Sequence, residues 1–156
     1  MDIIRQRVHD QHYINPIITH VATYGHLLLL EFLCSIGVNM HHASSTEFPS
    51  PLHAAVHGEQ LQVTRWLIER GADCNTRNSE GQTPLFYAVI KGLLDAVRAL
   101  VEDGGASLDI LDVRGNTAID WAKDYRSVSM YQHTFLWKYR VEEFKEIVNY
   151  LQERIC

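Results

Sequence analysis

The sequence of 156 residues lacks the features that mark membrane-spanning and nucleic-acid-binding proteins. None of its apolar runs approaches the roughly 20 consecutive residues that an α-helix needs to cross a bilayer. Its 14 lysine and arginine residues are outnumbered by 19 acidic residues, which gives a net charge of −5, and the basic residues form no cluster. Because a surface that follows phosphates needs clustered Lys and Arg, we expect no membrane insertion and no nucleic-acid partner.

Cysteine is also scarce. Cys34, Cys74 and Cys156 are the only three, they cannot all pair with one another, and their spacing fits no zinc-binding pattern. The first residues of the chain carry too many charges for the apolar core of a secretory signal. We therefore expect free thiols in a reducing compartment, which is the cytoplasm, with the nucleus as the alternative.

Motifs for catalysis and cofactor binding are missing as well. The chain has no Gly-x-Ser-x-Gly nucleophile elbow, and the glycines at 104–105 lack the Lys-Ser/Thr pair of a phosphate-binding loop. His53 and His57 are one helical turn apart, but no Glu follows His53 and no further ligand is spaced to complete a zinc site. We expect no enzymatic activity, no cofactor, no metal site and no small-molecule substrate.

What the sequence does contain is a repeat. Residues 50–55 read SPLHAA, residues 83–88 read TPLFYA, and residues 117–122 read TAIDWA, so the copies are 33 and 34 residues apart. The first two copies are each followed by an apolar stretch and then by a glycine-rich turn. A unit of this length cannot bury its apolar face alone and must stack on its neighbours, so the repeat predicts a solenoid.

These residues resemble the ankyrin repeat, in which Gly-x-Thr-Pro-Leu-His-x-Ala precedes a glycine, a Leu-rich helix and Gly-Ala-Asp-x-Asn. The match is best around Gly81, Thr83 and Gly92, and the resemblance covers about residues 17–126. It implies an all-α solenoid of stacked helix-turn-helix units connected by short β-hairpin loops. The predicted single domain comprises an N-terminal cap (1–16), a degenerate first repeat (17–50), repeats two (51–83) and three (84–117), and repeat four with an insertion and a C-terminal capping helix (118–156).

Repeat two departs from the family pattern at one turn. Gly58 lies one residue before the place where the family has its second glycine, and Glu59 occupies that place. Since the spacing to Gly71 is kept, we expect the turn between the two helices to shift by one residue.

The C-terminal segment allows two interpretations. Apolar residues recur at spacings of four and three, the pattern of a helical seam, at Met130, Thr134, Trp137, Val141, Phe144, Val148, Leu151 and Ile155. One interpretation, which we favour, is a loop at 127–140 and a capping helix from Val141. The other is one long helix that offers a second partner surface with Tyr131, Phe135, Trp137 and Tyr139.

The resemblance also implies roles for single residues. In the family, the histidine at the position of His53 is structural and bonds to the backbone of neighbouring turns. Phe86 and Ile119 replace it in the next two repeats, where we expect packing to substitute for the hydrogen bond. Asn75 corresponds to a hairpin asparagine that either bonds the loop backbone, as we favour, or is hydroxylated.

Ankyrin-like solenoids bind partners through the hairpin tips and the inner face of the first helices. If each hairpin tip is counted with the repeat whose first helix follows it, the corresponding positions are Thr23 and Tyr24 in repeat one; Thr46, Glu47, Pro49 and His57 in repeat two; Arg77, Ser79, Glu80, Gln82, Ile90 and Lys91 in repeat three; and Val113, Arg114, Asn116, Asp124 and Tyr125 in repeat four. Tyr24, Ile90 and Tyr125 stand out as large residues at positions that packing does not require, and large aromatic anchors often dominate interfaces.

We therefore expect a non-enzymatic module that binds a protein partner through these positions. Two alternatives are an assembly element that pairs through its C-terminal helix, and an adaptor or effector subunit of a larger complex. The identity of the partner does not follow from the sequence, because one fold serves many functions.

Overall fold

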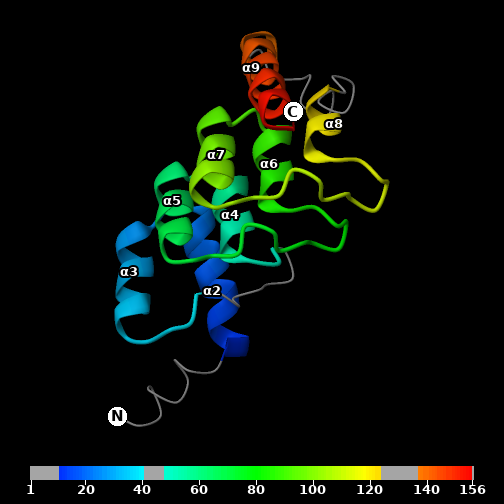
Figure 1. Ribbon diagram of the computed structural model, residues 1–156. Helices are drawn as coiled ribbons and strands as arrows, with labels where there is room; N and C mark the ends of the chain where they lie inside the picture. The colour runs from blue at the N-terminus through cyan, green and yellow to red at the C-terminus, as the bar shows by residue number, and fades with distance from the viewer. Residues whose placement is uncertain (1–10, 41–47, 124–136, 156) are drawn as a thin grey trace.

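The computed structural model describes residues 11–40, 48–123 and 137–155, which form a row of paired helices (Figure 1). The pairs are α2 (Gln11–Thr23) with α3 (Leu27–Ser35), α4 (Pro51–His57) with α5 (Leu61–Glu69), α6 (Pro84–Ile90) with α7 (Leu94–Arg98), and α8 (Ala118–Lys123) with α9 (Trp137–Ile155). A π-helical turn, η1 (Ala99–Asp103), extends α7. No helix in these ranges is long and apolar enough to cross a membrane.

The pairs stack in chain order. The first helices α2, α4, α6 and α8 contact one another in succession, and from α5 onward the second helices do the same, α5 with α7 and η1 and α7 with α9. Ala54, Ala55 and Ala88 are fully buried, so the first helices approach closely. This arrangement confirms the predicted all-α repeat fold.

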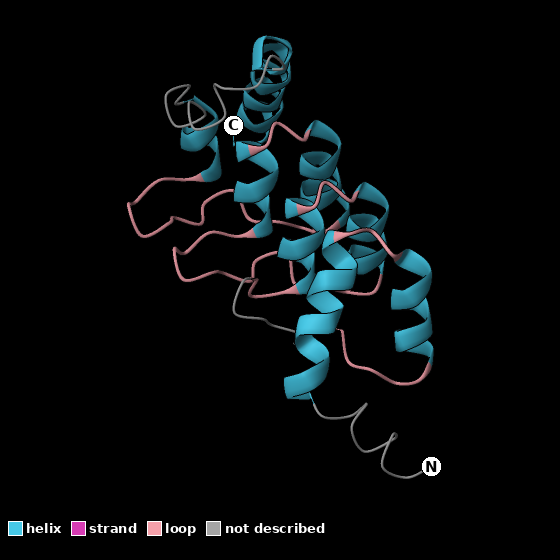
Figure 2. Ribbon diagram, turned by 180° about the vertical axis from the view of Figure 1, so that it is seen from behind, coloured by secondary structure: helices cyan, strands magenta, loops and turns pink. Residues whose placement is uncertain are grey.

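The segments between the pairs are turns. Figure 2 shows no strand in the described ranges. The amide of Asn78 donates to the carbonyl of Gln82 and that of Asp112 to Asn116, each at 2.9 Å. The two turns share one backbone bond, from Val113 to Glu80 at 2.9 Å. Because one bond does not make a ladder, the predicted β-hairpin loops have hairpin turns without β-strands.

Helix α4 shows how the repeat motif starts a helix. Ser50 has an extended backbone, and its side chain accepts a bond from the amide of His53 at 3.4 Å. Pro51 follows at the first helical position, where the missing N–H costs no intrahelical bond. Capping by Ser50 and the proline together fix the start of α4.

The turn after α4 differs from our expectation. Glu59 has φ of 60°, and the matching residues of repeats one and three, Gly25 and Gly92, have φ of 75° and 69°. The left-handed residue therefore keeps its place, and the predicted one-residue shift is wrong. Gly58, with φ of −76°, has a different role: a Cβ there would lie 2.0 Å from the carbonyl oxygen of Thr23. Its missing side chain lets repeat two approach α2.

Replacing Gly58 by alanine is therefore expected to destabilise the protein by about 2 kcal/mol, within the usual range for overpacking a close contact. Urea unfolding followed by circular dichroism measures this loss. Tyr24→Ala is the matched control, since Tyr24 holds the same position in repeat one and is exposed. Equal stability of the two variants would contradict the role assigned to Gly58.

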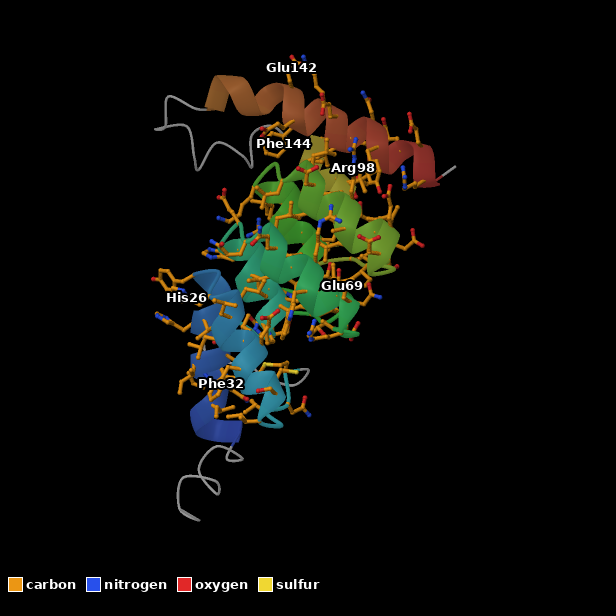
Figure 3. All side chains as sticks on the ribbon, turned by 90° about the vertical axis from the view of Figure 1, so that its left-hand side faces the viewer. His26, Phe32, Glu69, Arg98, Glu142 and Phe144 are labelled. Atoms are coloured by element: carbon orange, nitrogen blue, oxygen red, sulfur yellow. The ribbon has the colours of Figure 1, made fainter. Side chains whose placement is uncertain are left out.

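Helix α9 covers the C-terminal end of the row. Phe144, Ile147 and Leu151 are buried, and α9 contacts α7 and α8. Figure 3 shows Phe144 directed toward the other helices and Glu142 directed away from them. The hydroxyl of Tyr150 also donates to Glu102 at 2.9 Å, which ties α9 to η1. The described part of the predicted seam thus packs within the chain.

The ends of the chain are partly described. Helix α9 begins at Trp137, inside the loop of the favoured interpretation, while 124–136 lie outside the described residues. Helix α2 begins at Gln11, inside the segment predicted as an N-terminal cap, and residues 1–10 also lie outside the described part. The predicted repeat boundaries otherwise remain predictions.

Candidate interaction surface

The tip of repeat three is held by one side chain. Oδ1 of Asn78 accepts the amides of Glu80 at 2.9 Å and Gln82 at 2.8 Å. Its Nδ2 donates to the hydroxyl of Tyr87 on α6 at 3.0 Å. The loop is therefore fixed to the helix that follows it.

The tip of repeat four repeats this design with a charged residue. Oδ1 of Asp112 accepts the amides of Arg114 and Asn116, both at 2.9 Å, and Oδ2 accepts Nε1 of Trp121 at 2.8 Å. Burial alone would raise the pKa of Asp112, but the hydrogen bonds from Asn116, Trp121 and Arg114 outweigh it and lower the pKa. Asp112 is thus an ionised anchor that holds the loop on α8.

Arg77 joins the two tips. Its Nη2 donates to the carbonyl of Leu111 at 2.6 Å and its Nε to the carbonyl of Gly81 at 3.1 Å. Arg77 is exposed, as a partner-binding residue must be, but its guanidinium already bridges repeats three and four. Arg77 therefore has a structural role in addition to the predicted role in partner binding.

The tips expose side chains that the fold does not use. Glu80 and Arg114 are exposed, and beside them Val113 and Leu111 are 64% and 48% exposed. Gln82 and Asn116 are half-buried. We call Glu80, Gln82, Leu111, Val113, Arg114 and Asn116 the tip group. Leu111 was not among the positions predicted from the sequence. It directly precedes Asp112, the residue that holds the loop, and this position could have indicated it.

A second set of candidates lies at the C-terminal ends of the first helices: Tyr24, His57, Ile90 and Lys91, the helix-end group. Tyr24 is 61% exposed and its ring lies 4.6 Å from that of His20. His57 is exposed and contacts Phe48 at 5.0 Å between ring centroids. Ile90 is half-buried against the core, so packing does use this position. Lys91 pairs with Glu59 at 3.4 Å.

The two groups lie at opposite ends of the first helices. Helix α6 has 7 residues, and at 1.5 Å per residue it separates the groups by about 10 Å. The structure thus does not bring the candidates into one cluster but places them on two edges of the row. Other predicted positions lie outside the described residues, namely Thr46, Glu47, Asp124, Tyr125, Tyr131 and Phe135, and the side chains of Trp137 and Tyr139 do too.

His53 has the structural role that the resemblance implies. Its side chain is fully buried, with Nδ1 2.8 Å from the hydroxyl of Ser50 and Nε2 3.2 Å from the carbonyl of Gln82. Burial lowers the pKa of His53 to about 4, although the bond to Gln82 acts in the opposite direction. The imidazole is therefore neutral at pH 7, and its Nε2–H binds repeat two to the tip of repeat three.

Asn75 also bonds to the backbone, because its Oδ1 accepts the amide of Ser107 from the next loop at 2.8 Å.

Metal binding finds no support in the described ranges, where no three His, Cys, Asp or Glu side chains are grouped to hold an ion. The described cysteines, Cys34 and Cys74, are free, and burial followed by the charge of Asp73 raises the pKa of Cys74 to about 11. A buried thiol of this kind is unreactive.

Comparison with known proteins agrees with this architecture. A family model described as ankyrin repeats (3 copies) matches residues 18–112 and 52–153. The chain is 30% identical over 96 residues to ankyrin repeat domain-containing protein 37 of Mus musculus, which covers 62% of this chain and 60% of that protein. It is 38% identical over 73 residues to the probable 26S proteasome regulatory subunit p28 of Saccharomyces cerevisiae, covering 46% of this chain and 32% of the relative. A putative ankyrin repeat protein of Fowlpox virus, FPV219, is 37% identical over 65 residues, 42% of this chain and 15% of its own. The chain thus spans less than two thirds of the length of each of these relatives.

Proposed function

Because this chain belongs to the ankyrin-repeat family, we propose that it is a non-enzymatic protein-interaction module that binds a protein partner through the tip group and the helix-end group. Ankyrin repeats generally serve protein–protein interaction.

One observation carries the proposal. Val113 and Leu111 stand exposed on a loop that Asp112 fixes, between the charges of Glu80 and Arg114. An exposed apolar side chain on a rigid loop loses little conformational entropy when a partner covers it. Apolar side chains ringed by charged ones also match the usual composition of an interface, with an apolar centre and a polar rim.

Packing of α9 disfavours the assembly alternative. Phe144 and Leu151, which the seam would offer to a second helix, are buried against the chain's own α7 and α8. Self-pairing through them would require α9 to leave the solenoid.

We propose a location in the cytoplasm or nucleus, because the described cysteines, Cys34 and Cys74, are free.

The test compares partner binding by three variants after capture of the partner from the source cells. The tip variant is Val113→Asp/Arg114→Glu and the helix-end variant is Tyr24→Glu. Each is expected to raise the measured Kd roughly tenfold or more, as the loss of an interface hot spot does. Glu69→Lys, on the exposed face of α5, is the control and should bind like wild type. Biolayer interferometry gives the Kd, and urea unfolding verifies that each variant is folded.

Each variant reports on one edge of the row. Loss of affinity in the tip variant alone would restrict the interface to the tips. Wild-type affinity in both the tip and the helix-end variant would contradict the proposed surface.

A further inference from the structure

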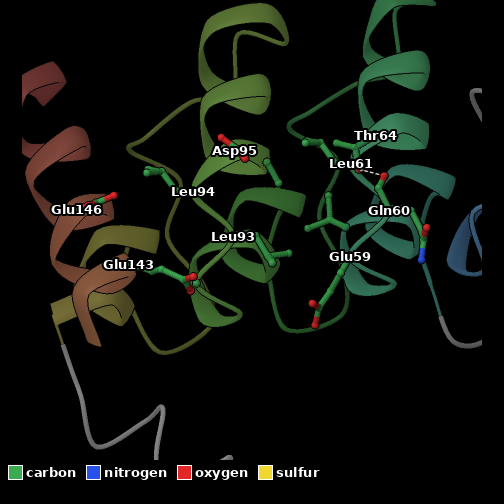
Figure 4. A pocket seen from close by; sticks show the side chains of 12 residues that line it. Glu59, Gln60, Leu61, Thr64, Leu93, Leu94, Asp95, Glu143 and Glu146 are labelled. Atoms are coloured by element: carbon green, nitrogen blue, oxygen red, sulfur yellow. Dashed lines mark hydrogen bonds between the residues drawn. The ribbon is translucent and has the colours of Figure 1, made fainter. Parts of the chain in front are cut away.

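A groove of about 500 Å³ opens between α5, α7 and α9, at the turns that join the first helices to the second helices (Figure 4). Leu61, Leu93 and Leu94 supply its apolar lining, and all three are half-buried. A volume of this size falls within the range of sites that bind organic ligands or a few side chains. The groove belongs to neither group of candidate residues described above.

Four carboxylates surround this apolar lining. Glu59 comes from the turn before α5, Asp95 from α7, and Glu143 and Glu146 from α9, and all four are exposed. Figure 4 shows Glu143 and Glu146 projecting from α9 on the side that faces α7. Three parts of the fold thus contribute negative charge to the same groove.

Most of this charge is not neutralised within the described part of the chain. Glu59 pairs with Lys91 at 3.4 Å, but Asp95, Glu143 and Glu146 form no ion pair with any described residue. Glu143 and Glu146 are three residues apart on α9, a spacing at which like charges destabilise a helix.

Nearby cations are used elsewhere. Lys145 pairs with Glu142 at 2.6 Å, Arg154 with Glu102 at 2.8 Å, and Arg65 with Asp103 at 3.6 Å. Within the described part of the chain, the groove therefore keeps a net negative charge.

We propose that this groove binds a segment of a partner protein that carries Lys or Arg side chains next to apolar ones. The aliphatic stem of Lys or Arg packs along leucines while its charged end reaches carboxylates, so one basic side chain uses both parts of the lining. The adjacent apolar side chain of the segment covers the leucines that remain. Binding relieves the repulsion between Glu143 and Glu146, and complementary charge selects basic segments over acidic ones.

The test uses the full chain and a fluorescein-labelled peptide of alternating leucine and arginine, with binding followed by fluorescence anisotropy. The groove variant is Asp95→Asn/Glu143→Gln/Glu146→Gln. Its matched control is Glu69→Gln/Asp109→Asn/Glu153→Gln, which removes the same charge from exposed positions outside the groove. The groove variant is expected to raise the Kd roughly tenfold and the control less than about twofold, because only the first removes close charge pairs.

A second set of measurements tests whether the leucines of the groove contribute to binding. A peptide with alanine in place of leucine should bind the wild-type protein roughly threefold to tenfold more weakly, in line with the loss of buried apolar area. The polyamine spermine carries positive charge but no apolar side chain, so it should compete only weakly with the labelled peptide. Competition by spermine as strong as that by the unlabelled peptide would overturn the proposal, since the leucines would then have no part in binding.

Three further outcomes would overturn it: no measurable binding by wild type, equal loss in the groove and control variants, or loss in the tip variant Val113→Asp/Arg114→Glu. The last would place the peptide on the tips and would leave the proposed function intact. Peptide binding that depends on the groove carboxylates, together with wild-type partner affinity in the tip and helix-end variants, would instead support the groove and contradict the proposed function.

Discussion

Between pH 7 and pH 5, the protein is expected to lose about 2 kcal/mol of its free energy of unfolding through His53 alone. The pKa of His53 is about 4 in the folded protein, against 6.5 for an ordinary histidine. As the pH falls below 6.5, the unfolded chain binds a proton that the folded protein does not accept until about pH 4. The stability that His53 contributes as a neutral side chain is therefore complete above pH 6.5 and is lost progressively down to pH 4, by about 3 kcal/mol in all.

Urea unfolding at pH 7, 6 and 5 of wild type and His53→Phe separates this effect from the titration of other groups. Phe86 occupies the equivalent position in repeat three and is buried, so a phenyl ring suits the site. At pH 7 the variant should be less stable by about 1–3 kcal/mol, because the carbonyl of Gln82 and the hydroxyl of Ser50 lose their partner. Its further loss toward pH 5 should be about 2 kcal/mol smaller than that of wild type.

The exposed His26 provides the control, as His26→Gln removes a histidine without emptying a buried site. This variant should keep the acid-dependent loss of the wild type. If His53→Phe shows the same loss between pH 7 and pH 5 as wild type, His53 is not the group that couples stability to acid in this range.

The repeat period made the stacked fold predictable, because it encodes directly a unit that must bury its apolar face on neighbours. The role of His53 was implied by the resemblance to the ankyrin repeat, and the repeat geometry explains why it holds. Its partners lie in the same motif and in the motif of the next repeat, so the regular spacing places them. What the sequence pattern describes well is therefore a contact between residues at fixed positions of the repeat.

Contacts made by residues that depart from the repeat pattern were not predictable. Gly58 suggested a displaced turn, but the glycine is needed for the close approach of Thr23 from another repeat. Glu59 tolerates φ of 60° because the turn is closed by the bond from Gln60 to the carbonyl of Ala55 at 2.9 Å, as in the other repeats. No local pattern distinguishes a glycine kept for its backbone angle from one kept for a neighbour.

The same limit applies to the capping helix and the surface. A seam with spacings of four and three included Phe144 and Leu151 but not Ile147, which is fully buried. Helix α9 packs against both α7 and α8, and two partners bury a wider stripe than one. Among the candidate surface residues, Ile90 packs on the core, and Arg77 bridges two tips, a contact that depends on the placement of the neighbouring repeat.

Replacing Phe86 by alanine is expected to have the largest effect of any single substitution considered, a loss of about 3–5 kcal/mol in the free energy of unfolding. Phe86 is the largest fully buried side chain in the described part of the chain, with 1% of its surface exposed. It lies on α6, which contacts α4, α7 and α8. The cavity cannot close easily, because α6 is already packed against both α4 and α8.

The position of α6 makes this loss affect more than one repeat. In a solenoid, stability is close to a sum of repeat terms and interfaces between neighbours, and α6 takes part in the interfaces on both sides. Urea unfolding of Phe86→Ala should therefore show a much lower midpoint, and hydrogen exchange should show reduced protection in α4 and α8 as well as α6. Phe32→Ala on α3 is the control, and with Phe32 57% exposed it should cost less than about 1 kcal/mol. If Phe86→Ala lost as little stability as Phe32→Ala, the helices would be closing the cavity. The tight stacking of the first helices would then not be the main source of stability between repeats.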